Sequence, residues 1–360
     1  MLHGTEVEAA RSFGPAMVAA PKLATDPQYA EGILATIGNT PLVKLSRYLD
    51  NDAVELFAKL EFGNPGGSAK DRPAVQMLRH ALDNALIDNN TVVIESSSGN
   101  MGIGLAQACR YLQLRFVCVA DPHAQPQNLA ILRALGAEIV LVTQPVAGSF
   151  LAARLEKVRE LLDEIPEAYW PNQYANPDNP KAYELGTIRE LDEALQGQID
   201  YLFVATSTTG TALGCRDYLR SRGRSTEVVA VDSTGSVLFG GQLAKRHIPG
   251  LGAGIEPILA RGQRFDYVRR VSDIDCVVGC RRAAHYEALL VGGSAGGVLE
   301  AVRSMESVLT GKRCAAILHD SGTRYLETVF NDQWVKDVLQ FDPAKLDERI
   351  HAAPDTFHEN

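Results

Sequence analysis

Short apolar runs alternate with amphipathic segments over most of the chain. Six of these runs have the length and apolar character of buried strands. They occupy residues 91–96, 115–121, 138–143, 201–206, 227–233 and 314–320. Segments with helical spacing follow several of them, among them 103–113, 126–136 and 149–165. This alternation predicts an α/β fold with parallel strands.

The chain divides into two halves at a crossing rich in proline and asparagine, residues 171–183. We expect an N-terminal half at 25–175, which includes a smaller and mobile α/β domain. A C-terminal α/β domain is expected at 176–335. The two ends, residues 1–24 and 336–360, are predicted to be flexible.

Composition is that of an ordinary soluble globular protein, with 46% hydrophobic and 22% charged residues in a chain of 360. The net charge of −9 and the lack of a basic block argue against nucleic acid as a partner. No apolar run approaches the roughly 20 residues of a membrane span, and no secretion signal is visible. Six scattered cysteines indicate a reduced, cytoplasmic protein. Cys276 and Cys280 are interpreted as core thiols, because no cysteine or histidine pair follows at zinc spacing.

The stretch "NPGGSAKDR", residues 64–72, raises the question of what Lys70 does. Its proline and glycines predict a turn, and Ser68 is a candidate N-cap for a helix that follows. Lys70 would then lie at the positive end of the helix dipole, where a purely structural lysine is unfavourable. The spacing excludes a Walker phosphate loop. A surface charge and a chemical role for the amine both remain open at this point.

Three further loops carry candidate chemistry because each opens a predicted helix. They are "SSSGNMG" (96–102), "STTGT" (207–211) and "VGGSAGG" (291–297). Their backbone N–H groups and hydroxyls suit a carboxylate or a phosphate. Each loop taken alone is equally well explained as ordinary helix capping.

Five motifs taken together resemble a known family. They are "IGNTPLVKL" (37–45), "NPGGSAKDR" (64–72), "SSGNMG" (97–102), "NQYANP" (172–177) and "GGSAGG" (292–297). In this order and spacing, residues 33–325 resemble the fold type II pyridoxal-phosphate enzymes related to cysteine synthase and cystathionine β-synthase. The resemblance implies two open, twisted α/β domains with the cofactor in the cleft between them, and a homodimer.

The resemblance also implies roles for individual residues. Lys70 would form the Schiff base and then remove the substrate's α-proton, while Asn100 would bind the cofactor's ring hydroxyl. Ser294 would face the pyridine nitrogen and leave it unprotonated. The cofactor phosphate would be held by Ser207, Thr208, Thr209, Gly210 and Thr211. The amino acid carboxylate would be bound by Ser97, Ser98, Met101 and Gln173.

Several positions depart from the sulfide-using cysteine synthases. Ser207 and Thr209 replace glycines of the usual phosphate loop, and Tyr174 stands where many cysteine synthases have phenylalanine. These departures, with "VDSTGSVLFGG" (231–241) and "IPGLGAGIEP" (248–257), resemble members that join O-phospho-L-serine to the amino group of L-glutamate. That reaction begins the synthesis of 2,3-diaminopropionate, a building block of siderophores and peptide antibiotics. A cysteine synthase and a catalytically silent binding partner are the alternatives.

Arg154 is the candidate cation for the phosphate leaving group of O-phospho-L-serine. It lies in the first turns of the helix predicted after residue 148, in the smaller domain. The alternative is that Arg154, two residues before Glu156, lies on a solvated helix face.

Overall fold

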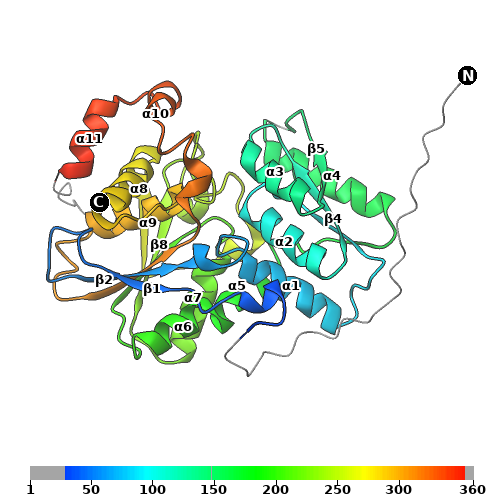
Figure 1. The fold of residues 1–360 in the computed structure, drawn as a ribbon, viewed down its shortest axis with the longest axis horizontal. Helices are drawn as coiled ribbons and strands as arrows, with labels where there is room; N and C mark the ends of the chain where they lie inside the picture. The colour runs from blue at the N-terminus through cyan, green and yellow to red at the C-terminus, as the bar shows by residue number, and fades with distance from the viewer. Residues whose placement is uncertain (1–28, 147, 353–360) are drawn as a thin grey trace, which may run out of the picture.

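The computed structural model describes residues 29–146 and 148–352 of the chain. These residues form two lobes, each built on its own sheet, with helices α1 and α5 between them (Figure 1). The predicted α/β fold is confirmed. The predicted flexible segment at 1–24 lies outside the described residues. None of the described helices is both long and apolar enough to cross a membrane.

The larger sheet has six strands, of which only the β1–β2 pair is antiparallel. In spatial order they are β1 (Leu42–Leu45), β2 (Glu55–Leu60), β10 (Arg313–Leu318), β7 (Tyr201–Ala205), β8 (Glu227–Ser233) and β9 (Tyr267–Val271). The segment 25–175 therefore supplies two strands to the larger lobe besides forming the smaller one. Because β2 pairs in parallel with β10, more than 250 residues further on, this placement depends on a long-range contact that local pattern does not reveal.

The smaller sheet has four parallel strands. In spatial order they are β5 (Glu138–Leu141), β4 (Arg115–Ala120), β3 (Val92–Glu95) and β6 (Ala168–Tyr169). All four residues of β3 are buried, as expected for a parallel strand that is covered on both faces. All six strands predicted from the apolar runs are present, with ends within two residues of those predicted.

Helices cover both sheets. They are α1 (Asp71–Asp83), α2 (Asn100–Tyr111), α3 (Pro126–Ala134), α4 (Phe150–Glu164), α5 (Asp178–Leu185), α6 (Thr187–Ala194), α7 (Gly210–Ser221), α8 (Asp273–Glu287), α9 (Gly293–Ser304), α10 (Asp332–Val338) and α11 (Pro343–His351).

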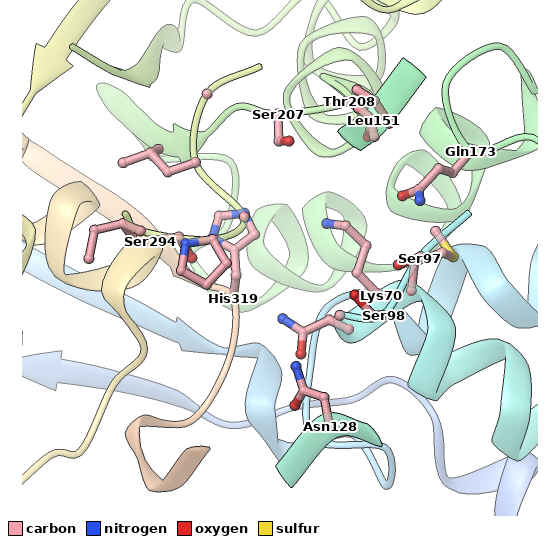
Figure 2. Close-up of a pocket in the computed structure, with 18 of the residues that line it drawn as sticks. Lys70, Ser97, Ser98, Asn128, Leu151, Gln173, Ser207, Thr208, Ser294 and His319 are labelled. Atoms are coloured by element: carbon pink, nitrogen blue, oxygen red, sulfur yellow. The ribbon is translucent and has the colours of Figure 1, made fainter. Parts of the chain in front are cut away.

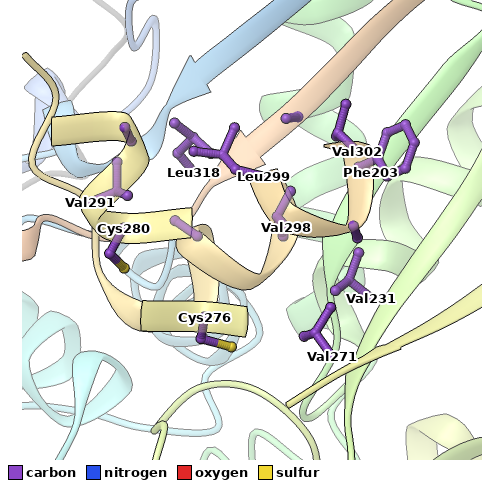
Figure 3. Close-up of a cluster of buried hydrophobic side chains, with 14 of the residues drawn as sticks. Phe203, Val231, Val271, Cys276, Cys280, Val291, Val298, Leu299, Val302 and Leu318 are labelled. Carbon is purple, nitrogen blue, oxygen red and sulfur yellow. The ribbon is translucent and has the colours of Figure 1, made fainter. Parts of the chain in front are cut away.

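The largest core lies between the larger sheet and helices α8 and α9 (Figure 3). Phe203 and Val231 of the sheet pack in it with Val298 of α9. The two helices approach closely through glycines, since a Cβ on Gly279 would lie 2.0 Å from the carbonyl oxygen of Gly296. Cys276 and Cys280 are buried free thiols in this core, as predicted.

Part of the C-terminal segment 336–360, which was predicted to be flexible, is helical. Residues 343–351 form α11, whose Leu346 and Ile350 are buried in the main core. The buried Arg282 donates a hydrogen bond of 2.7 Å to the carbonyl oxygen of Ile350. The apolar positions are four residues apart, so they lie on one helix face and pack against the larger lobe.

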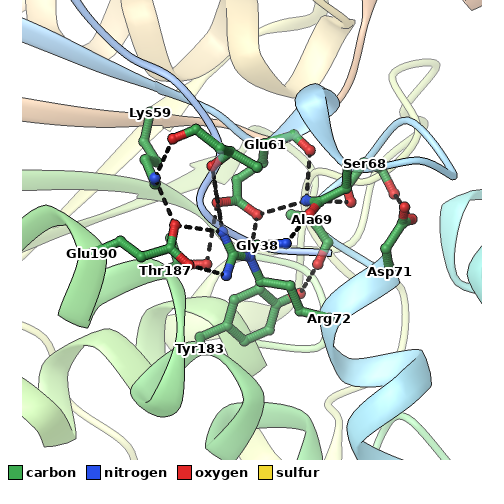
Figure 4. Close-up of polar contacts among 12 residues, drawn as sticks. Gly38, Lys59, Glu61, Ser68, Ala69, Asp71, Arg72, Tyr183, Thr187 and Glu190 are labelled. Atoms are coloured by element: carbon green, nitrogen blue, oxygen red, sulfur yellow. Dashed lines mark hydrogen bonds and ion pairs between the residues drawn. The ribbon is translucent and has the colours of Figure 1, made fainter. Parts of the chain in front are cut away.

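A buried ionic network joins β2, α1 and α6 (Figure 4). Arg72 of α1 makes a two-pronged contact with Glu61, at 2.7 and 2.8 Å, and another with Glu190, at 2.6 and 2.9 Å. Lys59 adds a second cation 2.7 Å from Glu190. Burial alone would raise the pKa of Glu190, but Arg72 and Lys59 together lower it to about 2. The network holds the start of α1, and with it Lys70, against the larger lobe.

Replacement of Arg72 by methionine is expected to destabilise the fold strongly. Glu61, which is fully buried, would be left without its partner. Removing one member of a buried pair lowers the free energy of unfolding by about 3–5 kcal/mol, measurable by urea unfolding. The control is Arg115→Met, which breaks the exposed pair with Glu138 and should change stability by less than about 1 kcal/mol. Equal, small effects in both variants would contradict this account of the network.

Candidate active site

A cavity of about 490 Å³ lies between the two lobes (Figure 2). Of the site residues predicted from the sequence, only Gly210 does not line it. Those that do are Lys70, Ser97, Ser98, Asn100, Met101, Arg154, Gln173, Tyr174, Ser207, Thr208, Thr209, Thr211 and Ser294. The sequence therefore predicted one site from segments more than 200 residues apart.

The carboxyl ends of parallel strands bring these residues together. Ser96 follows β3, Asp121 follows β4, Thr206 follows β7 and His319 follows β10. In open α/β sheets, loops at this edge meet helix N-termini and form the ligand site. The two sheets turn this edge toward the same cavity, so each contributes one wall.

The turn before α1 positions Lys70. Gly67 has φ +82°, a conformation that favours glycine. The helix begins at Asp71, with Lys70 itself at the N-cap position, so the prediction of Ser68 as N-cap is wrong. The Ser68 hydroxyl instead accepts a hydrogen bond from the Lys70 N–H at 3.1 Å, and the helix begins two residues later than predicted.

The Lys70 amine enters the cavity and lies 3.4 Å from the Tyr183 hydroxyl. Burial lowers the pKa of Lys70 to about 8, against the opposing attraction of Asp320 and Glu61. Lys70 makes no ion pair within the described residues. The uncharged amine, which a nucleophile or base requires, is therefore far more populated near neutral pH than in an exposed lysine.

Asn100 is held by two charged side chains that the sequence analysis did not single out. Its amide NH₂ donates to Asp320 at 2.8 Å, and its amide oxygen accepts from Arg324 at 2.6 Å. Asp320 also accepts a hydrogen bond from the Tyr325 hydroxyl at 2.5 Å. Burial raises the pKa of Asp320. The signal for Asp320 was present, since it ends the predicted strand 314–320, whereas Arg324 lies in a 3₁₀ turn without a pattern of its own.

The 207–211 loop forms the N-terminus of α7. Thr209 adopts φ +69° there, which turns the chain into the helix. The side chain of Asn179 donates to the Thr208 hydroxyl at 3.3 Å and to the Gln173 carbonyl at 2.7 Å, so it joins two cavity loops. A Cβ on Gly210 would lie 2.2 Å from the Asn179 amide oxygen, and this close approach requires glycine.

A buried carboxylate connects the cavity loops at 96–102 and 172–177. Glu95, at the end of β3, accepts hydrogen bonds from the Ser96 N–H at 2.8 Å, the Trp170 indole at 3.0 Å and the Gln173 N–H at 3.1 Å. Burial raises the pKa of Glu95, although these three donors oppose the rise. The loops at 96–102 and 172–177 therefore have a fixed spacing across the smaller lobe's wall.

Arg154 faces the cavity rather than solvent, so the solvated-face alternative is wrong. Its side chain is 16% exposed, and its Nε lies 3.1 Å from Asp121. Tyr174 lies in the same part of the site, where burial raises the pKa of its hydroxyl to about 12 against the influence of Arg154. The Tyr174 hydroxyl is therefore a hydrogen-bond donor at neutral pH.

The charge of the lining favours an anionic ligand. Lys70, Arg154 and Arg246 line the cavity, and Asp121, paired with Arg154, is the one acidic residue in the lining. His123, His247 and His319 add imidazoles. The segment 248–257 was singled out from the sequence, but Arg246 and His247, which directly precede it and also line the cavity, were not. Across the described ranges 29–146 and 148–352, no three metal-ligating side chains lie together.

Comparison with known proteins identifies the relatives of this chain. A family model described as "Pyridoxal-phosphate dependent enzyme" matches residues 33–320. A hydrogen sulfide-producing enzyme from Fusobacterium nucleatum is 31% identical, with a TM-score of 0.76 over 83% of this chain and 100% of its own. The O-acetylserine dependent cystathionine beta-synthase from Helicobacter pylori is 28% identical, with a TM-score of 0.77 over 83% and 98%. An O-ureido-L-serine synthase is also 28% identical, with a TM-score of 0.79 over 89% and 99%.

The cavity fits pyridoxal phosphate. Among the residues that the structure describes, Lys70 is the only lysine in the lining, and it can meet the aldehyde. The N-terminus of the twelve-residue helix α7 and its threonines suit the phosphate. Asn100 and Ser294 offer polar groups to the ring, and the volume is within the range of small-molecule sites.

The pH dependence of cofactor capture follows from the pKa of Lys70. Only the uncharged amine attacks an aldehyde, so capture of pyridoxal phosphate by the apoenzyme should become faster as pH rises through about 8, then level off. With an exposed lysine, the capture rate would keep rising until the pH reached the ordinary lysine pKa of about 10.4. Stopped-flow absorbance measures the rate, and Lys70→Ala is the control. A rate that still rises above pH 9.5, or a borohydride-reducible link in Lys70→Ala, would contradict the assignment.

Proposed function

Because the chain belongs to the family of pyridoxal-phosphate dependent enzymes, we propose that it joins O-phospho-L-serine to the amino group of L-glutamate. The products are N-(2-amino-2-carboxyethyl)-L-glutamate and phosphate, and the reaction is a β-replacement of the cysteine synthase kind. Such a product is the first intermediate on a route to 2,3-diaminopropionate. The chain is thus an enzyme rather than a silent binding partner.

The observation that carries the proposal is the presence of Arg154, Ser207 and Tyr174 in the same cavity as Lys70. L-Glutamate brings two carboxylates to the site, and O-phospho-L-serine brings a carboxylate and a phosphate. Hydroxyl and guanidinium donors bind such groups by charge-assisted hydrogen bonds. Sulfide needs none of these contacts, so a site for sulfide alone would have no use for them.

Some of the cavity residues are assigned to the cofactor and others to the substrates. When bound, pyridoxal phosphate supplies an electron sink that acidifies the α-carbon of the amino acid. We assign Lys70 two tasks: it holds the cofactor covalently and, as an uncharged amine, takes the α-proton. Thr208, Thr209 and Thr211, with Ser207, are assigned to the cofactor phosphate at the N-terminus of α7.

The remaining residues orient the ring and the substrate. Asn100, fixed by Asp320 and Arg324, is assigned to the ring hydroxyl, and Ser294 to the pyridine nitrogen. The loop residues Ser97, Ser98, Met101 and Gln173 are assigned to the substrate carboxylate, because they lie on the wall held by Glu95.

A cysteine synthase is the second candidate, and the relatives favour it. One structural relative is named as a hydrogen sulfide-producing enzyme and another as an O-acetylserine dependent cystathionine beta-synthase. A nucleophile screen separates the two candidates. Phosphate release from O-phospho-L-serine is measured with glutamate, sulfide and other amino acids offered singly. We expect glutamate to give the highest turnover. If the enzyme uses sulfide efficiently and does not use glutamate, the proposal is wrong.

Arg154→Ala should impair the use of O-phospho-L-serine selectively. A charge-assisted bond to a phosphate contributes about 1.5–3 kcal/mol, which is roughly ten- to hundredfold in kcat/KM. O-Acetyl-L-serine, whose ester group carries no charge, should lose much less. The control is Arg159→Ala, on the exposed face of the same helix α4. An equal loss with both donors would reject the role of Arg154.

Ser207→Gly and Tyr174→Phe should weaken the use of glutamate and leave the first half of the reaction largely intact, because the three threonines and the backbone N–H groups of the 207–211 loop would still hold the cofactor phosphate. Each removes one hydroxyl, and a hydrogen bond to a charged group contributes about 1.5–3 kcal/mol. The measurement is KM for glutamate alongside the rate of phosphate release in a single turnover with O-phospho-L-serine alone. If both half-reactions fall together with cofactor affinity, Ser207 and Tyr174 serve the cofactor or the fold instead.

A further inference from the structure

His319 is a buried imidazole that has no hydrogen-bond partner for its ring. It directly follows β10, is 6% exposed and lines the cavity. Among the residues that the structure describes, neither Nδ1 nor Nε2 has a partner. Its backbone is well anchored, since the His319 carbonyl oxygen accepts from the Ala69 N–H at 2.8 Å. The main chain therefore fixes the ring's position while leaving both nitrogens unused.

This ring is neutral in the folded protein. Burial, followed by the nearby charge of Lys70, lowers the pKa of His319 to about 3, against a smaller opposing effect of the Ile317 backbone. A neutral imidazole has one N–H donor and one acceptor nitrogen. Leaving both unpaired in a buried place disfavours folding relative to an apolar side chain of similar size. A polar group retained under that penalty in a ligand cavity points to a hydrogen bond that forms when the ligand is bound.

Local structure brings His319 next to Ser294. The Gly292 N–H donates to the Asp320 carbonyl at 3.0 Å, which joins the start of α9 to the segment after β10. Figure 2 shows the His319 ring beside Ser294, with the Lys70 amine facing both across the cavity. Ser294 is 4% exposed, and its hydroxyl makes no hydrogen bond within the part of the chain that the structure describes.

We propose that His319 is a positioning residue for the cofactor ring. With the cofactor bound, the His319 imidazole donates its N–H to the Ser294 hydroxyl oxygen. A serine hydroxyl has a single hydrogen and two acceptor lone pairs. When the oxygen accepts from His319, that hydrogen is free to point at the pyridine nitrogen. The inference rests on the proposed placement of Ser294 at this nitrogen.

A neutral imidazole in this position has a second consequence. Because His319 resists protonation, the His319–Ser294 pair offers the pyridine nitrogen a hydrogen bond but no proton. The nitrogen then stays unprotonated, and the ring stays a weaker electron sink. A carboxylate in the place of Ser294 would have the opposite effect, since it stabilises a protonated nitrogen.

The first test compares the apoenzyme with the cofactor-loaded enzyme in His319→Leu. We expect the apoenzyme to melt at the same or a higher temperature, because an unpaired buried polar group is removed. The Kd for pyridoxal phosphate should rise roughly tenfold or more, and the absorbance spectrum of the bound cofactor should change. His319→Asn, which keeps a donor at a similar distance, should recover part of the affinity.

His247→Leu is the matched control for stability. His247 also lines the cavity, but its Nδ1 lies 2.8 Å from Asp273, so its removal leaves a carboxylate without its partner. The His247→Leu apoenzyme should therefore melt at a lower temperature than the wild type. If the His319→Leu apoenzyme melts lower as well, His319 is a structural residue and the proposal is wrong.

The second test asks whether His319 acts through Ser294. In a Ser294→Ala background, His319→Leu should cause no further loss of cofactor affinity and no further spectral change. Independent, additive losses would overturn the positioning role, as would wild-type affinity and spectrum in His319→Leu. These measurements use no amino acid substrate, so their outcome does not depend on whether the enzyme uses glutamate or sulfide.

Discussion

The buried contacts of Arg72 with Glu61 and Glu190 are the constraint on which the site depends. Arg72 lies two residues after Lys70, at the junction of the two lobes. Glu61 follows β2 of the larger sheet, and Glu190 belongs to α6 on that same lobe. The guanidinium thus fixes the start of α1 from two directions. Lys70 enters the cavity from a rigid turn rather than from a mobile loop, as precise placement of a reacting amine requires.

The same arrangement explains why the Lys70 amine is reactive. Two carboxylates lie near enough to favour its charged form, but both are engaged elsewhere: Glu61 with Arg72, and Asp320 with Asn100 and Tyr325. Burial therefore outweighs them, and the pKa of Lys70 falls to about 8. The residues that hold the site together therefore also bind the two carboxylates nearest to the amine. The cavity is left with a cationic and hydroxyl lining that suits phosphorylated and acidic ligands.

The sequence predicted those parts of the protein that depend on local pattern. The parallel strands and three of the cavity loops followed from apolar runs and from helix-start motifs at strand ends, whereas the individual site residues followed from the resemblance to a family. The placement of β1 and β2 in the larger sheet did not, because it depends on pairing with a strand at the other end of the chain. Arg246 and Arg324 were missed because they lie in irregular loops, and His319 because a single imidazole has no spacing to mark it. The helix at 343–351 was missed because its apolar face is short.

The central claim is that this cavity accepts an amino acid as the attacking nucleophile. A direct test is a competition in which the cofactor-loaded enzyme receives O-phospho-L-serine with equal amounts of L-glutamate and sulfide. The products are identified by mass spectrometry after less than a tenth of the O-phospho-L-serine is consumed. The account predicts that N-(2-amino-2-carboxyethyl)-L-glutamate is the main product; cysteine as the main product would contradict it.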